Sequence, residues 1–147
     1  SRGYCMTTTT KLKPATFKHI EAELYAYHET KKEIVRLREE IMHNTQVDEN
    51  VGQGKNSYRT PSRPTEIIAT RLTTDKRLRN LEEIVDAIEK TYEQVDENHK
   101  KMIRLAYWSN KQYTWQRVAE ECYVHPNTMT KMRRKVVYLV ADHIGWT

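Results

Sequence analysis

Two amphipathic segments separated by only three residues, between positions 114 and 144, place the strongest constraint on the fold of this chain. Thr114 suits the N-cap of a helix, and the residues after it repeat apolar side chains at helical spacing. Pro126 stands where a helix best tolerates proline, in its first turn. The pattern therefore predicts a first helix from Trp115 to Cys122, a turn over residues 123–125 and a second helix over residues 126–142.

The second of these predicted helices has two faces of different chemistry. The apolar face is expected to pack into a core and contains Met129, Met132, Val136, Leu139, Val140 and Ile144. The opposite face carries amides, hydroxyls and cations, at Asn127, Thr130, Lys131, Arg134 and Tyr138. A helix of this kind suits the major groove of duplex DNA. The segment is therefore predicted to be a helix-turn-helix that binds DNA.

The positive charge of the chain is concentrated in the same region. Residues 100–137 contain nine Lys or Arg and two acidic residues, a net charge of +7, whereas the whole chain carries +5 and the remainder therefore −2. A surplus of cations confined to one module is expected of a DNA-binding protein. A solvated basic surface is the plainer alternative, and charge alone leaves it open.

The angular position of each polar residue around the second helix predicts which part of the DNA it contacts. Asn127, Thr130, Lys131 and Arg134 point away from the apolar face and are expected to face the groove. Asparagine pairs well with adenine, and lysine and arginine favour guanine. For the two cations the competing interpretation is an ordinary solvated helix face.

Residues at the flanks are expected to contact phosphates rather than bases. Arg133 and Lys135 lie at the edges of the polar face, and Gln116 and Arg117 lie in the first turn after the Thr114 cap. Such backbone contacts fix the register of a protein on DNA without reading its sequence.

The turn between the helices departs from the usual pattern at two positions. Tyr123 stands where glycine is common, and a side chain in the left-handed conformation costs on the order of 1 kcal/mol. His125 occupies the N-cap position, where serine or threonine is commoner, and is expected to cap the helix or to contact a phosphate, with capping preferred. Thr128 completes the predicted DNA-binding set, although helix-start propensity also explains it.

Two longer amphipathic segments precede this region, at residues 14–43 and about 65–95, with apolar residues at spacings of three and four. Asp96 is a predicted N-cap for a shorter helix over residues 97–108. The predicted fold class is therefore all-α, with two long helices that resemble a helical hairpin or coiled coil, followed by the C-terminal helix-turn-helix. The two apolar stripes contain Phe17, Ile20, Leu24, Tyr27, Ile34, Leu37 and Ile41 in the first and Ile68, Leu72, Leu78, Leu81, Val85, Ile88, Tyr92 and Val95 in the second.

Glycine, proline and small polar residues at 44–64 predict a loop or linker between the long helices. The expected organisation is a flexible N-terminus over residues 1–11, a helical hairpin or oligomerisation region over 12–95, and a DNA-binding domain over 96–147. A homo-oligomer is expected, most simply a dimer. The apolar seam suits helix pairing within one chain or between two chains.

Several classes of protein lack support in the sequence. The six histidines are scattered, neither CxxC nor HExxH occurs, and no nucleophile context or paired carboxylates stand out, so we expect no metal, no cofactor and no enzymatic activity. Cys5 and Cys122 do not suggest a disulfide framework. No apolar run approaches the ~20 residues needed to cross a bilayer, and no secretory signal is visible, so no membrane partner is expected.

Taken together, these segments resemble the RinA/ArpU family of phage transcriptional regulators from about residue 12 onwards. The resemblance implies an activator of late phage genes, including the packaging and structural operon, that acts in the cytoplasm of the bacterial host at the nucleoid. It also implies that the C-terminal part is similar to region 4 of sigma factors and can face host RNA polymerase. The stretches that carry the resemblance are LREEIMHNT (37–45), RPTEIIATRL (63–72), the Leu81–Tyr92 segment, RLAYW (104–108), TWQRVAEECYVHPNTM (114–129) and HIGW (143–146).

Two alternatives remain open at this point. A small terminase subunit also combines a helix-turn-helix with oligomerising helices and binds packaging-site DNA, but its DNA-binding module usually lies at the N-terminus. A sigma-like subunit would need a region that melts the promoter, and residues 44–64 lack the aromatic cluster that would indicate one. We therefore expect double-stranded DNA as the partner and transcriptional activation as the function.

Overall fold

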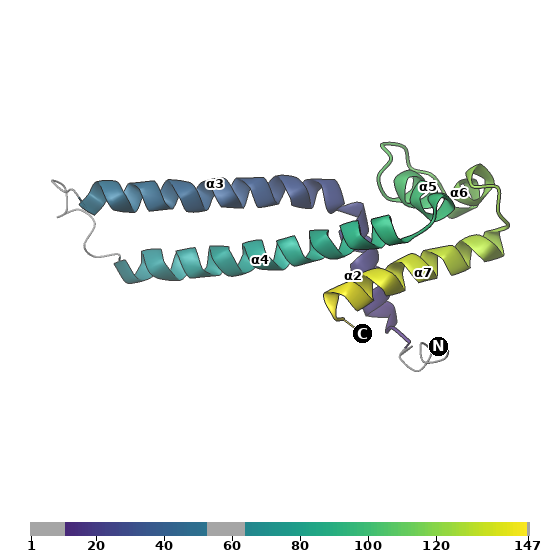
Figure 1. Cartoon of the computed structure of the whole chain (residues 1–147), viewed down its shortest axis with the longest axis horizontal. Helices are drawn as coiled ribbons and strands as arrows, with labels where there is room; N and C mark the ends of the chain where they lie inside the picture. The colour runs from purple at the N-terminus through teal and green to yellow at the C-terminus, as the bar shows by residue number, and fades with distance from the viewer. Residues whose placement is uncertain (1–10, 53–63, 147) are drawn as a thin grey trace. The chain divides into compact units, whose positions relative to one another are not determined.

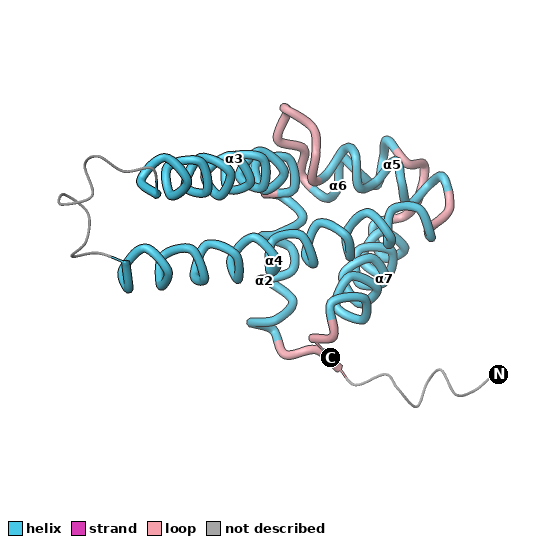
Figure 2. The backbone as a smooth tube through the Cα atoms, turned by 60° about the vertical axis from the view of Figure 1, so that its left-hand side comes forward, coloured by secondary structure: helices cyan, strands magenta, loops and turns pink. Residues whose placement is uncertain are grey.

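The computed structural model describes residues 11–52 and 64–146, and every regular element within these ranges is an α-helix (Figures 1 and 2). The all-α prediction is therefore confirmed for this part of the chain. The helices are α2 (Pro14–Tyr25), α3 (Tyr27–Gly52), α4 (Pro64–Gln94), α5 (Glu97–Ala106), α6 (Trp115–Glu121) and α7 (Pro126–Ile144).

The single helix predicted over residues 14–43 is wrong, because the chain breaks at Ala26 into α2 and α3. A tertiary contact accompanies the break: the indole Nε1 of Trp108 donates to the backbone oxygen of Leu24, at 3.2 Å, in the last turn of α2. Tyr27, the first residue of α3, stacks on the same indole with ring centroids 4.7 Å apart. Local periodicity carries no information about a contact with a residue so distant in the sequence.

The loop predicted over residues 44–64 is also wrong in its first part, since α3 continues to Gly52. Residues 44–51 contain neither proline nor glycine, so their backbone chemistry does not end a helix before Gly52. At the other end, α4 begins at Pro64 itself, in a position that favours proline. The remainder of the predicted loop, residues 53–63, lies outside the described residues.

Packing divides the chain into two compact units. Unit 1 is Ser1–His28 together with Ile84–Thr147, and unit 2 is Glu29–Glu83. The division by packing differs from the predicted boundary at residue 95, because α2 and the end of α4 share a core with the C-terminal helices. Both ends of the sequence therefore contribute to unit 1, and the middle of the sequence forms unit 2.

The core of unit 1 forms where α7 packs against α2 and α6, and α5 packs against α6 (Figure 1). The centre of the predicted apolar face of α7 is confirmed, since Met129, Met132, Val136 and Val140 are buried. Leu139 and Ile144 are only half-buried, and Val137 and Ala141 take the corresponding buried positions. Fully buried partners from the other helices include Ile20, Leu24, Ile88, Met102, Ile103 and Val118.

Unit 2 contains long stretches of α3 and α4, which run antiparallel beside each other in both views (Figures 1 and 2). Ile34 and Leu37 are buried, as the predicted stripe requires. Ion pairs join the helices at their surface, among them Arg38 with Glu82 at 2.6 Å and Arg77 with Glu33 at 3.3 Å. Exposed pairs of this kind contribute little stability each, about 0–1 kcal/mol.

The starts of α5 and α6 are confirmed to the residue. The Asp96 carboxylate accepts the backbone N–H of His99 at 2.9 Å, and the Thr114 hydroxyl accepts that of Arg117 at 3.1 Å. Each cap satisfies a donor that the first turn of a helix leaves without a partner. The predicted ends are slightly too long, because α5 ends at Ala106 and α6 ends at Glu121.

Candidate nucleic-acid interface

The connection between α6 and α7 is a tight turn built from two backbone hydrogen bonds. Tyr123 donates its N–H to Glu120 and Val124 donates its N–H to Ala119, both at 3.0 Å. This pair of bonds closes a Schellman motif, which requires one residue in the left-handed conformation. Tyr123 supplies it with a φ of 59°, and its side chain is 89% exposed.

His125 caps the start of α7. Its ring Nδ1 accepts the backbone N–H of Asn127 at 3.0 Å, so the preferred capping role is confirmed. Pro126 follows in the first turn, and the Thr130 hydroxyl donates to the Pro126 carbonyl oxygen at 3.2 Å. The imidazole therefore caps the start of this helix, a role that serine or threonine has more often.

The solvent-facing side of α7 is polar and cationic along its first three turns. Asn127, Thr128, Thr130, Lys131, Arg134 and Lys135 are all exposed. The guanidinium of Arg134 lies 4.9 Å from the centroid of the Tyr138 ring, which holds the cation against the helix surface. Tyr138 itself is half-buried, and its hydroxyl accepts the backbone N–H of Leu12 at 2.9 Å.

The two predicted contacts on α6 are exposed as well. Gln116 and Arg117 lie in the first turn of this helix. Arg117 pairs with Glu121 one turn later, with Nε and Nη2 at 3.1 and 3.0 Å from the carboxylate. An exposed pair at this spacing is weak, so the guanidinium can exchange Glu121 for a phosphate at little cost.

Arg133 differs from the other predicted contacts, because the structure gives its guanidinium another partner. Nε and Nη2 donate to the two carboxylate oxygens of Glu21 at 2.6 and 2.7 Å. The same guanidinium lies 4.5 Å from the centroid of Trp115 and 5.7 Å from that of Phe17. Arg133 thus joins α7 to α2 and α6, and this arrangement removes it from the set of free cations.

Glu21 was not among the predicted functional residues, yet it organises this part of unit 1. It is 7% exposed and also accepts the hydroxyl of Tyr107 at 2.7 Å. Burial, together with the Glu21 carboxylate, raises the pKa of Tyr107 well above its usual range. The hydrogen bonds to Glu21 raise the pKa of Arg133. The sequence contains one indication of this role. Glu21 lies inside the apolar stripe of Phe17, Ile20 and Leu24, where a carboxylate needs a buried partner.

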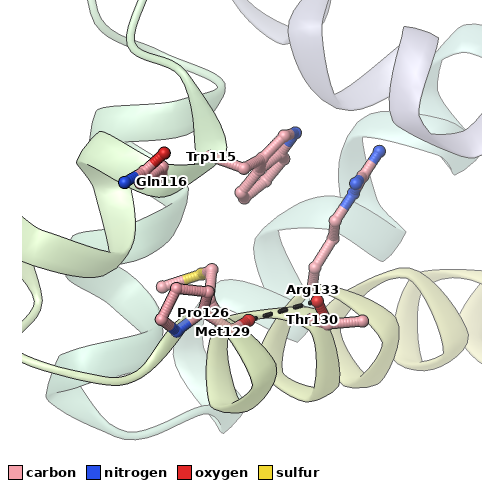
Figure 3. A pocket seen from close by; sticks show the side chains of 6 residues that line it. All are labelled: Trp115, Gln116, Pro126, Met129, Thr130 and Arg133. Atoms are coloured by element: carbon pink, nitrogen blue, oxygen red, sulfur yellow. Dashed lines mark hydrogen bonds between the residues drawn. The ribbon is translucent and has the colours of Figure 1, made fainter.

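A cleft of about 160 Å³ opens between α6 and the start of α7 (Figure 3). Trp115 and Arg133 lie beside each other at one side of it, and Pro126 and Met129 form part of its α7 wall. Gln116 and Thr130, one predicted contact from each helix, also line this space. The cleft therefore brings together residues that the sequence assigned separately to backbone and base contacts.

Two other kinds of site are not found among the described residues. No group of three or more His, Cys, Asp or Glu side chains in these ranges is arranged to hold a metal ion. None of the described helices contains an apolar stretch of the length that crossing a bilayer requires.

Residues 19–142 of the chain match the family described as "Protein of unknown function (DUF722)". The match covers most of the chain, so the chain belongs to this family. No curated protein and no solved structure matches it significantly.

Proposed function

We propose that this member of the DUF722 family binds duplex DNA by inserting α7 into the major groove, with α6, the Tyr123 turn and α7 acting as a helix-turn-helix. The observation that carries the proposal is the two-sided chemistry of α7. One side is buried in the core of unit 1, and the other presents exposed amide, hydroxyl and cationic groups on a rigid, capped helix. A major groove about 12 Å wide admits such a helix.

The exposed residues divide into two kinds of contact. Asn127, Thr130, Lys131 and Arg134 would face base edges, where each good bidentate pair discriminates by about 1–3 kcal/mol. Gln116, Arg117 and Lys135 would contact phosphates beside the groove. The Arg117–Glu121 pair supports the assignment of Arg117 to a phosphate contact. The pair is exposed and weak, so the guanidinium can leave Glu121 at a small cost in free energy.

The biological role in this proposal is activation of late phage transcription, including the packaging and structural genes. It rests on the resemblance to the RinA/ArpU regulators, as do host RNA polymerase as a second partner and the bacterial cytoplasm as the location. Unit 2 would serve as a helical hairpin for dimerisation. A two-fold dimer would place two copies of α7 one helical turn, ~34 Å, apart on a pseudo-palindromic site.

The test is a selection of bound fragments from the genomes of the source phage and its host, at one fixed salt concentration. Lys131→Ala/Arg134→Ala is compared with Lys76→Ala/Arg79→Ala, which removes one lysine and one arginine at the same spacing from exposed positions of α4. We expect the wild type and the α4 variant to enrich the same site and the α7 variant to lose it. Salt-sensitive binding without enrichment, equal in all three proteins, would contradict groove reading.

The position of the enriched site separates transcription from packaging. A site next to a late-gene promoter supports an activator. Enrichment within the coding region of the packaging genes would instead support the terminase-like alternative, and a large ring in solution would add to that result.

A further inference from the structure

We infer that Tyr123 and Lys101 form an additional contact with the DNA sugar-phosphate backbone, next to the groove-facing side of α7. The inference rests on the proposed function and adds a contact that lies outside α7. It starts from the identity of the residue in the turn between α6 and α7.

Glycine would adopt the left-handed backbone conformation of this turn at a lower cost in free energy than tyrosine does. Tyr123 is the one non-glycine residue with a positive φ in the described part of the chain, and Gly145 fills the comparable position after α7. A tyrosine in this conformation costs on the order of 1 kcal/mol. Burial does not offset this cost, because the side chain is 89% exposed. A large aromatic side chain kept in a strained and exposed position indicates a role for the side chain itself.

The phenol ring has a cation beside it. The ammonium of Lys101 lies 5.1 Å from the centroid of the Tyr123 ring. The neighbouring cations of α5 have other partners: Lys100 is 3.5 Å from Glu97, and Arg104 donates to the hydroxyl of Tyr92 at 2.6 Å. Lys101 and Tyr123 together therefore offer an ammonium and a phenol O–H, both of which donate to phosphate oxygens.

The pair lies next to the turn that leads into α7. Asn98 of α5 donates to the backbone oxygen of Cys122 at 3.3 Å, which fixes α5 to the turn. Tyr123 itself precedes Pro126, the first residue of α7, by only three positions. Lys101 and Tyr123 therefore lie near the start of α7, where Asn127 and Thr128 are exposed.

The chemistry favours DNA over an acidic protein. A helix in the major groove has a phosphate backbone on each side, so cations along both edges of α7 find partners simultaneously. Gln116 and Arg117 lie in the first turn of α6, and the Lys101–Tyr123 pair lies at the other end of this helix, at the turn into α7. An isolated acidic patch on a protein would not explain why the Lys101–Tyr123 pair lies so near the exposed polar face of α7.

The experiment measures the dissociation constant for one duplex at several salt concentrations, in wild type, Lys101→Gln, Tyr123→Gly and Lys100→Gln. The duplex is the selected site. Each phosphate contact contributes about 0.9 to the slope of log K against log salt. We expect Lys101→Gln to lower the slope by about one contact and Lys100→Gln, the matched control on the same helix, to leave it unchanged. Tyr123→Gly should weaken binding by about tenfold, as loss of a hydrogen bond to a charged group does, while its melting temperature stays equal or rises.

Three results would overturn the inference. Wild-type affinity and slope in both Lys101→Gln and Tyr123→Gly, with binding lost in Lys131→Ala/Arg134→Ala, would leave the proposed function intact and assign this surface to another partner, such as an acidic protein. A fall in melting temperature of Tyr123→Gly that matches its loss of affinity, with no change in Lys101→Gln, would assign the tyrosine to folding. Failure of the wild type to bind any duplex would remove the proposed function and the inference with it.

Discussion

Glu21 of α2 and Arg133 of α7 form a bidentate ion pair with Nε–Oε2 and Nη2–Oε1 distances of 2.6 and 2.7 Å, across 112 positions of sequence. The Glu21 side chain is 10% exposed and that of Arg133 is 34% exposed. The pair closes unit 1 at the point where the candidate DNA-binding helix meets the N-terminal helix. Its position makes the stability of α7 dependent on a residue far from α6 and α7 in the sequence.

Glu21→Gln should lower the free energy of unfolding by on the order of 2 kcal/mol. Loss of one partner leaves a cation without its counter-charge in a partly buried site, and the exposure of Arg133 keeps the cost below the 3–5 kcal/mol of a fully buried pair. Urea denaturation measures the change. Glu29→Gln is the control, because the Glu29–Lys32 pair has side-chain exposures of 77% and 75%, and it should change stability by less than about 0.5 kcal/mol. Equal effects of the two substitutions would contradict the structural role.

Replacement of both partners separates the structural role of Arg133 from the predicted phosphate contact. Glu21→Gln/Arg133→Met removes the two charges together, which is often tolerated where removal of one is not. Since the guanidinium is already occupied by Glu21, we expect the salt slope of DNA binding to remain at the wild-type value. A reduction of the slope by about one would show that Arg133 does contact a phosphate.

Alkaline pH should destabilise unit 1, in part through Tyr107. Its pKa is raised above 10.0 in the folded protein by burial and by Glu21, whereas in the unfolded chain it has its ordinary value. The stabilising contribution is therefore complete below pH 10 and is lost progressively as the pH rises above it. Unfolding free energies of Tyr107→Phe, measured on both sides of pH 10, should fall less steeply than those of the wild type. Parallel profiles would refute the assignment.

Acidic pH should also destabilise unit 1, in part through Asp96. The backbone and ring hydrogen bonds from His99 lower the pKa of this carboxyl below 3.8, so its contribution is present above that pH and is lost as the pH falls through the lower value in the folded state. Asp96→Asn should keep the cap and remove this part of the acid sensitivity. Asp96→Ala should cost about 1 kcal/mol at neutral pH. Thermal melts across the acid range distinguish the two variants.

The cap at the start of α7 can be tested in the same way. His125→Ser should retain stability, because its hydroxyl can accept the Asn127 N–H, and His125→Ala should cost about 1 kcal/mol. DNA affinity at fixed salt should be the same in His125→Ser as in the wild type. A serine variant that folds normally but binds DNA more weakly would reveal a phosphate contact by the imidazole.

The helix starts could be predicted from the sequence, because local chemistry decides them. Asp96, Thr114 and Pro126 mark the starts of α5, α6 and α7 where the structure has them. The centre of the buried face of α7 followed from its periodicity in the same way. Caps and periodicity involve residues within four positions of each other, so a single sequence contains the required information.

Features set by distant contacts could not be predicted. The break at Ala26 coincides with the hydrogen bond from Trp108 to Leu24, across 84 positions. Arg133 looked like one more cation on the edge of α7, since its partner Glu21 lies in another helix. The continuation of α3 to Gly52 was missed for another reason: the polar composition of residues 44–51 resembles that of a loop, but it contains no residue that ends a helix.

The contribution of both chain ends to unit 1 has a consequence for synthesis. The ribosome synthesises Glu21 long before Arg133. The core that α2 shares with α7 can therefore form only after α7 has been synthesised. Unit 2 lies between the two parts of unit 1 in the sequence and acts as the tether across which that core closes. The entropic part of the free energy of closing such a tether rises by only about 0.6 kcal/mol for each doubling of its length. Changes in the length of unit 2 therefore cost unit 1 little stability, whereas a chain truncated before Arg133 leaves α2 without the helix that holds it.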